Sequence, residues 1–384
     1  MTEDPQPISN RRITLSLSNV LLVIAAVLLL VLLWQLQGLI VLLMISVVLA
    51  ASIVPIVNWA EAQRVPRWLA VILVYLTLVA GLTGLGLIIG PSVFDQISAL
   101  VRQLPIFAER IVDILTDWSI RLGEDKPELI DRLIDTQSVT NWVIRSSQQL
   151  ILRSYGITRG ILGGVASLIL ALFLSGYMVA DSKKLIHSLV QLFPYPWNER
   201  LNTQVKPVSQ RMGGYIRGRL LVSGILGVAT TTSLGFLGLR EFSLGLGAIA
   251  AVTNLIPFLG PFLGAIPALV VALAKGGFLV VWVLLLYVII QNIETYILDP
   301  FLVGTSVGVH PLYQLLSVLG GIQVLGILGA LIVPPWFAGF SALIENLYLQ
   351  PKLTAEQQQG KALTTTSDPA TPPGLKSPKP SISK

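Results

Sequence analysis

The chain has 384 residues, of which 53% are hydrophobic and only 12% charged, with a mean hydropathy of +0.76 and a formal net charge of +6. Soluble proteins carry about 25% charged residues, so this composition indicates a polytopic, all-α membrane protein. There is no cysteine, which excludes disulfides, thiolate nucleophiles and cysteine-ligated metals, and two histidines are too few for a histidine-rich metal site. The positive charge predicts membrane topology and contact with membrane lipid, and it does not indicate a nucleic-acid partner.

The N-terminal quarter alternates apolar runs with short polar connections. A cytoplasmic lead, 1–14, precedes three predicted transmembrane helices within 15–91. The uncharged stretch Gln35–Gly38 predicts a tight turn, so the first two helices should form a hairpin. The third should end at Gly90–Pro91, where glycine and proline weaken a helix.

Two charged segments then flank a further span. Residues 92–156 are amphipathic and slightly acidic, which predicts extracytoplasmic helices that pack on the membrane part or on a neighbouring subunit. Residues 157–180 form the fourth predicted transmembrane helix, and 181–219 form a basic, cytoplasmic helical segment. Its last arginines, Arg217 and Arg219, are interpreted as residues that snorkel to the membrane surface. The distribution of Lys and Arg places both termini in the cytoplasm.

The C-terminal part combines a predicted transport core with a polar tail. The core, 220–350, contains two apolar runs that proline and glycine interrupt, at 243–274 and 300–346. The tail, 351–384, consists mostly of Pro, Ser, Thr, Gln and Lys, and this composition predicts disorder.

The first interrupted run is the most informative stretch of the chain. In lipid, a broken helix survives only where protein or a water-filled cavity satisfies the freed backbone groups, as in transporter sites. The run is therefore predicted to be a re-entrant hairpin whose tip lines the substrate path, the alternative being a simple kink between packed helices. Asn254, just before the break, would bind substrate or a cation, or would instead satisfy a freed backbone group. The other candidate pathway residues here are Pro257, Gly260, Pro261, Gly264 and Pro267.

The second interrupted run would open to the opposite side of the membrane. The two runs would then form an inverted pair of hairpins, a recurrent plan in transporters. The alternative is that 307–333 crosses the membrane as one kinked helix. If the pair forms, both tips should meet near mid-membrane, with Asn254 and Glu294 beside a common polar cavity.

Polar residues near the end of the span 278–298 supply further candidates. Glu294 would carry a coupling proton or sodium ion, or it would be an interfacial residue one turn from Asp299. Asp299 would coordinate an ion or cap a helix. His310 would take part in proton coupling, or it would be an ordinary loop-end histidine. The full set of candidates in this region is Gln291, Asn292, Glu294, Asp299, His310 and Pro311.

Several ordered motifs resemble those of the autoinducer-2 exporter (AI-2E) family. They are Tyr215–Leu220, Asn254–Pro261, Gln291–Pro300 and Val309–Leu312, followed by Gly320–Gly321 and Gly326. The resemblance spans almost the whole chain to about residue 350. It implies a homo-oligomer in the bacterial inner (plasma) membrane with about eight membrane-crossing or re-entrant segments. It also implies export of the furanone signal autoinducer-2, or sodium/proton antiport as in some members.

Two classes of function remain open from the residues. The first is a secondary carrier of a small molecule or ion, with no cofactor beyond a coupling ion (H⁺ or Na⁺). The second is a membrane scaffold or accessory subunit that transports nothing. The chain lacks a Gly-x-x-x-x-Gly-Lys-Ser/Thr phosphate loop, which argues against ATP-driven transport, and it lacks recognisable intramembrane catalytic motifs, so an enzyme is not expected.

Overall fold

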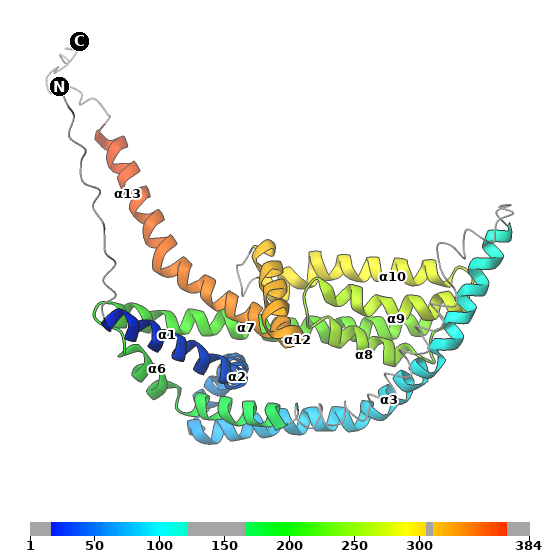
Figure 1. Ribbon diagram of the computed structural model, residues 1–384, viewed down its shortest axis with the longest axis horizontal. Helices are drawn as coiled ribbons and strands as arrows, with labels where there is room; N and C mark the ends of the chain where they lie inside the picture. Colours follow the sequence, from blue (N-terminus) through cyan, green and yellow to red (C-terminus); the bar gives the residue numbers. More distant parts are fainter. Residues whose placement is uncertain (1–16, 122–163, 165, 305–309, 367–384) are drawn as a thin grey trace, which may run out of the picture.

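The computed structural model describes residues 17–121, 164, 166–304 and 310–366. Within these ranges the chain is helical and contains no strand (Figure 1). In chain order the elements are α1 (Leu17–Gln35), α2 (Gln37–Ala62), α3 (Arg67–Arg121), an unlabelled helix (Ala166–Ala180), α6 (Ser182–Val190), α7 (Trp197–Phe236), α8 (Ser243–Thr253), α9 (Leu259–Lys275), α10 (Leu279–Ile293), the π-helix η1 (Glu294–Gly304), α12 (Pro311–Ile344), the π-helical turn η2 (Glu345–Leu349) and α13 (Gln350–Thr366).

Five of the described helices are long and apolar enough to cross a membrane: α2, α3 as far as Phe107, α7, α10 with η1, and α12 with its continuation to Gln359. A sixth span results if Ala166–Ala180 and Ser182–Val190, which meet at 80°, are counted together. The chain is therefore a multi-pass membrane protein. The count of about eight membrane-crossing or re-entrant segments stays a prediction, because α1, α8 and α9 are apolar but shorter than these spans.

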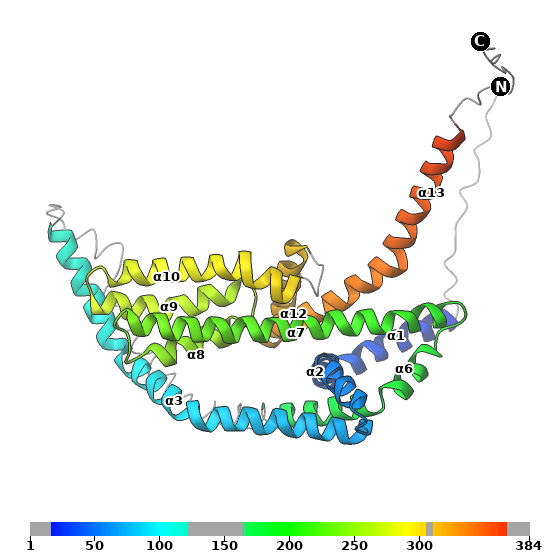
Figure 2. The ribbon, with the colours of Figure 1, turned by 180° about the vertical axis from the view of Figure 1, so that it is seen from behind.

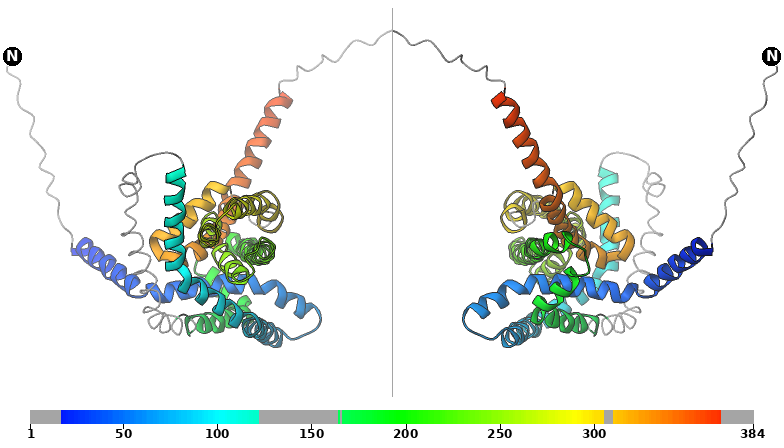
Figure 3. Two further views of the ribbon diagram at one scale, coloured as in Figure 1. Left: turned by 90° about the vertical axis from the view of Figure 1, so that its right-hand side faces the viewer. Right: turned by 90° about the vertical axis from the view of Figure 1, so that its left-hand side faces the viewer.

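The predicted hairpin between the first two helices is not formed. Leu36 is the only residue between α1 and α2, and helical hydrogen bonds continue across it, from Leu36 N to Leu32 O and from Ile40 N to Leu36 O, each 2.9 Å. Figure 3 shows α2 running on from α1 without folding back along it. An uncharged stretch with one glycine is compatible with helix, so the absence of charge at Gln35–Gly38 did not require a turn.

Helix α3 also continues beyond its predicted end. It runs through Pro91 and Pro105 as far as Arg121, and it bends upward toward α8 and α9 (Figures 1 and 2). A proline inside a helix bends it without always ending it. The described part of the amphipathic segment 92–156 is thus the second half of α3, and 122–156 lie outside the described residues.

This second half of α3 packs on the α8–α9 unit. Gly245 N donates to Gln96 Oε1 at 2.8 Å, and Phe107 and Phe242 meet edge to face with ring centroids 6.1 Å apart. Leu100 and Phe107 belong to the same buried cluster as Leu246 and Val271. Packing on the membrane part, one of the two predicted alternatives, is therefore observed for residues 96–110.

Both interrupted runs reverse the chain direction. Helices α8 and α9 are joined by residues 254–258 and lie against each other (Figure 2). Within α12, Gly326 has non-helical angles (φ 65°, ψ −150°), and the backbones of Gly321 and Gly329 touch on either side of it. Residues 311–344 thus form a second hairpin and not one kinked helix.

The tail begins with order where its composition predicts disorder. Helix α13 continues to Thr366, exposed along its described side chains, and projects away from the bundle (Figures 1 and 2). Its Ala, Glu, Gln and Leu residues are good helix formers, and Lys352 pairs with Glu356 one turn away. Residues 367–384 lie outside the described residues.

Candidate functional site

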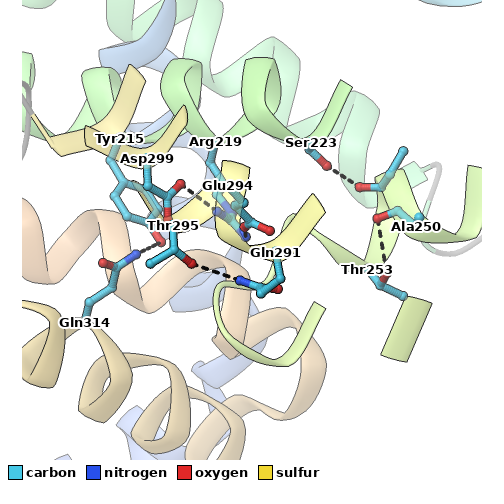
Figure 4. Close-up of polar contacts among 11 residues, drawn as sticks. Tyr215, Arg219, Ser223, Ala250, Thr253, Gln291, Glu294, Thr295, Asp299 and Gln314 are labelled. Atoms are coloured by element: carbon cyan, nitrogen blue, oxygen red, sulfur yellow. Dashed lines mark hydrogen bonds and ion pairs between the residues drawn. The ribbon is translucent and has the colours of Figure 1, made fainter. Parts of the chain in front are cut away.

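One face of α7 organises the core. Tyr215, Arg219, Ser223 and Gly227 recur every four residues, so they lie above one another on the helix surface. The first three contact three different parts of the chain: Gln314 Nε2 donates to the Tyr215 hydroxyl at 3.5 Å, Arg219 pairs with two acids of η1, and Ser223 Oγ donates to the Ala251 carbonyl. Gly227 lies against α8, like Ser223. Figure 4 shows these contacts side by side. A single helix face therefore joins α12, η1 and α8.

Arg219 is the centre of a buried charge cluster. Its side chain is 2% exposed, with Nη2 2.8 Å from Glu294 Oε1 and Nη1 3.2 Å from Asp299 Oδ1. Glu294 is as deeply buried as Arg219, whereas about a third of the Asp299 side chain is exposed (35%). With all three groups ionised, the cluster carries one net negative charge. Such a group is stable only while its charges remain paired, because an unpaired buried charge is very costly.

Three buried acceptor oxygens of the predicted pathway residues have no donor. Glu294 Oε2, Gln291 Oε1 and Asn254 Oδ1 are buried without a hydrogen-bond partner in the described structure. Gln291 and Glu294 share one helix face, and the Gln291 amide nitrogen donates to Thr295 Oγ1 at 3.1 Å. Carboxylate and amide oxygens are ligands for hard cations, and a proton would equally satisfy Glu294 Oε2. The geometry thus leaves Glu294 ready to take a proton or a cation on the oxygen that Arg219 does not contact.

The π-helix η1 carries Glu294 and Asp299 and packs against α7. The helix widens from α to π geometry at Glu294, and such segments are rare and often lie at functional sites. On the opposing side, a Cβ at Gly218 would lie closer than 3.0 Å to the Leu302 carbonyl. Only glycine lets α7 and η1 approach this closely, and Arg219 follows it directly. Local backbone geometry therefore sets the distance of the ion pair.

The tip of the α8–α9 hairpin is tightly packed. Pro257 is buried, and a Cβ at Gly260 would lie within 3.0 Å of the backbone of Thr253 and Asn254. Phe258 has a positive φ of 64°, a conformation that non-glycine residues rarely adopt. The Tyr287 hydroxyl donates to Gly264 O at 3.0 Å and ties α10 to α9.

The two prolines of α9 occupy different helical positions. Pro261 lies in the first turn, where a missing N–H is tolerated, and Pro267 lies in the interior of the helix. Both are partly buried.

A cavity of about 260 Å³ lies between the tips of the two hairpins. Leu255 of the first tip and Leu328 of the second both line it, together with Arg219 and Tyr215. The rest of the lining is apolar and comes from α2, α7, the unlabelled helix and α12. Its lining includes neither Asn254 nor Glu294, so this cavity is not the predicted polar cavity shared by those two residues.

Some predicted residues lie apart from the cluster. Asn292 is exposed and its amide donates to Val288 O of its own helix. His310 is exposed, and its Nδ1 accepts from Leu312 N at 3.2 Å, so it caps α12, while Pro311 is the first residue of that helix. Asp299 pairs with Arg219, so it takes part in the charge cluster.

Arg219 itself was misinterpreted from sequence. Neither it nor Arg217 snorkels: Arg219 is buried, and Arg217 Nη1 donates to the Ser52 carbonyl at 2.8 Å. The signal that distinguishes them is spacing, because Arg219 shares the four-residue repeat of Tyr215 and Ser223 and Arg217 does not.

Comparisons with known proteins agree on one family. The family model described as AI-2E family transporter matches residues 22–349. The chain is 33% identical to the putative transport protein YrrI of Bacillus subtilis over 301 residues, covering 76% of this chain and 82% of that protein. It is 27% identical to the putative permease PerM of Escherichia coli (74% and 80% covered) and 23% identical to a sodium-lithium/proton antiporter of Halobacillus andaensis (79% and 88% covered). The chain belongs to the AI-2E family of transporters.

Proposed function

We propose that this chain is a secondary transporter in which Glu294 binds a proton or a sodium ion and couples its movement to that of a second solute. The observation that carries this proposal is the buried Arg219–Glu294 pair, in which Glu294 Oε2 has no donor. Burying an ionisable side chain within a membrane span costs free energy, so such a residue is a candidate for a functional role. The Halobacillus andaensis relative is named a sodium-lithium/proton antiporter, which supports the same chemistry.

The Arg219 guanidinium competes with the cation for the Glu294 carboxylate. When Glu294 is ionised, Arg219 neutralises it at 2.8 Å; when Glu294 binds a proton or Na⁺, Arg219 is left to Asp299, 3.2 Å from its other nitrogen. Both contacts join α7 to η1. Cation binding at Glu294 would therefore leave α7 held to η1 through Asp299 alone, and this loosening is the step that would alternate access.

In this proposal the two hairpins are inverted relative to each other and close the cavity from opposite sides. This arrangement is supported by one residue from each tip, Leu255 and Leu328, because both line the same cavity. Helices α2 and α3 would form the scaffold, with a homo-oligomer in the inner membrane and both termini in the cytoplasm. The cargo would be a small molecule such as an autoinducer-2-like signal; exchange of Na⁺ for H⁺ alone is the alternative within the same mechanism.

Flux in proteoliposomes tests the proposal. With an imposed Na⁺ gradient, wild-type protein should change the internal pH reported by an entrapped pH-sensitive dye, and Glu294→Gln should reduce the initial rate at least tenfold. Glu356→Gln removes an exposed acid on α13 and should leave the rate unchanged. The same vesicles loaded with autoinducer-2 test cargo export under a pH gradient.

Equal rates for wild type and Glu294→Gln, in both the ion and the cargo assays, would contradict the role of Glu294. No flux of either kind from correctly folded wild-type protein would favour the scaffold alternative.

A further inference from the structure

A second site lies away from the charge cluster, where the chain leaves the membrane core. The helix Ala166–Ala180 turns by 80° into α6, which is nine residues long and amphipathic. Figures 1 and 2 show α6 below α7 and beside α2. A groove of about 420 Å³ lies between α6 and α7.

The groove is apolar along its length. Leu185, Ile186 and Leu189 line it from α6, and Val205 and Val208 line it from α7. Its polar lining is limited to neutral side chains: Ser182, Gln204 and Ser209. Among the residues that the structure describes, no ionisable side chain lines the groove, which therefore suits a hydrocarbon chain and not a charged peptide.

The N-terminal turn of α6 carries two positive charges that do not stabilise the helix. Lys183 and Lys184 are exposed in its first turn, where the helix dipole disfavours cations, and the N-cap residue Asp181 makes no side-chain capping bond. Within the described part of the chain, neither lysine has an ion-pair partner. Neither lysine lines the groove, but both follow Ser182, which does, in the first turn of α6. An anionic group at this end of the groove would therefore lie beside two lysines that have no ion-pair partner among the described residues.

Aromatic side chains continue this surface beyond α6. Phe193, Tyr195 and Trp197 are exposed, and the Arg200 guanidinium lies 5.7 Å from the centre of the Trp197 ring. Aromatic rings mixed with basic side chains are typical of the headgroup level of a membrane. The segment 181–200 therefore has the composition of a surface that lies at the membrane interface.

We propose that the groove between α6 and α7 binds one acyl chain of an anionic phospholipid, whose phosphate is bound by Lys183 and Lys184. The apolar lining accounts for the chain and the two lysines for the headgroup, and the exposed aromatic residues place both at the right depth. Because α2, α6 and α7 all line the groove, the lipid would link α6 to the helix that carries Arg219. This site is independent of Glu294 and of the transported solute.

Lipid titration of the delipidated, full-length protein in neutral detergent tests the proposal. Dioleoylphosphatidylglycerol should raise the melting temperature at concentrations at which dioleoylphosphatidylcholine, with identical chains, does not. A lysine beside an anionic headgroup contributes about a fivefold effect, so Lys183→Gln/Lys184→Gln should weaken the apparent affinity for phosphatidylglycerol about thirtyfold. Lys352→Gln, an exposed lysine on α13, should leave it unchanged.

A second variant tests the acyl chain separately. Ser209→Phe adds bulk inside the groove while leaving both lysines in place, and it should weaken phosphatidylglycerol binding at least tenfold. Glycerophosphoglycerol, the headgroup without chains, should cause no shift. The proposal is overturned if the two lipids stabilise the protein equally, if either variant binds phosphatidylglycerol like wild type, or if the chain-free headgroup gives the full shift.

Discussion

The two hairpins of the core reverse the chain by different means. The first uses residues 254–258, with a buried asparagine, a buried proline and Phe258 at a positive φ. The second reverses at Gly326, where glycine adopts the positive φ without strain and the backbones of Gly321 and Gly329 touch. The first tip thus holds polar and strained groups, whereas the second is built by close backbone packing. In the proposed mechanism the cation binds at η1, and the second hairpin closes the cavity.

The largest effect should come from breaking the charge cluster beside the first hairpin. Arg219→Leu leaves Glu294 buried without its partner, and removing one member of a buried ion pair costs about 3–5 kcal/mol. We expect a large loss in the free energy of unfolding, measured by chemical denaturation in detergent. The double variant Arg219→Leu/Glu294→Leu should recover most of that loss and still show no ion flux. A double variant as unstable as the single one would mean that the pair is not the reason for the loss.

The next effect tests the glycine contact of the second hairpin. A Cβ at Gly329 would lie closer than 3.0 Å to the Gly321 carbonyl, so Gly329→Ala should cost about 3 kcal/mol by overpacking. Gly320→Ala is the matched control, because nothing lies within 4 Å of its added Cβ. Thermal melts of the two variants check this. Similar melting temperatures would contradict the close packing of 311–325 on 327–344.

Placing glycine at the first turn and alanine at the second should change the free energy of unfolding in opposite directions. Phe258→Gly relieves a positive φ and should stabilise the fold by about 1 kcal/mol, whereas Gly326→Ala introduces that strain and should destabilise it by about 1–2 kcal/mol. Denaturation of both variants under one set of conditions provides the measurement. Two changes of the same sign would show that the turns do not differ in strain as described.

The smallest effect should come from the hydrogen bond that holds the first hairpin to α7. Ser223→Ala removes the donor to the Ala251 carbonyl and should cost about 1 kcal/mol. Thr232→Ala removes an exposed hydroxyl that bonds only within α7 and should change stability by less. An equal effect of both changes would argue that Ser223 contributes nothing to docking of α8.

Much of the core could be predicted from local sequence. The interruption of 243–274 by proline and glycine predicted a helix break at the correct residues, because missing N–H groups act wherever the helix is placed. That the resulting hairpin is re-entrant stays a prediction. Glu294 stood out as an ionisable residue in an apolar run. The first helical hairpin and the end of α3 at Pro91 were not predicted correctly, because an uncharged glycine or a single proline is compatible with either a turn or a bent helix.

The sequence by itself determined the membrane class, the family motifs and the position of the first break, because hydropathy and backbone chemistry are properties of each residue. Tertiary structure alone decided the role of Arg219. Arg217 and Arg219 are the same residue type and lie only two positions apart. Arg217 bonds to backbone carbonyls of α2, whereas Arg219 is buried between two acids. The four-residue repeat places Arg219 on the packed face of α7, but only the approach of η1 to Gly218 brings two acids to it. The cost of burying a guanidinium depends on which charges the fold brings within bonding distance.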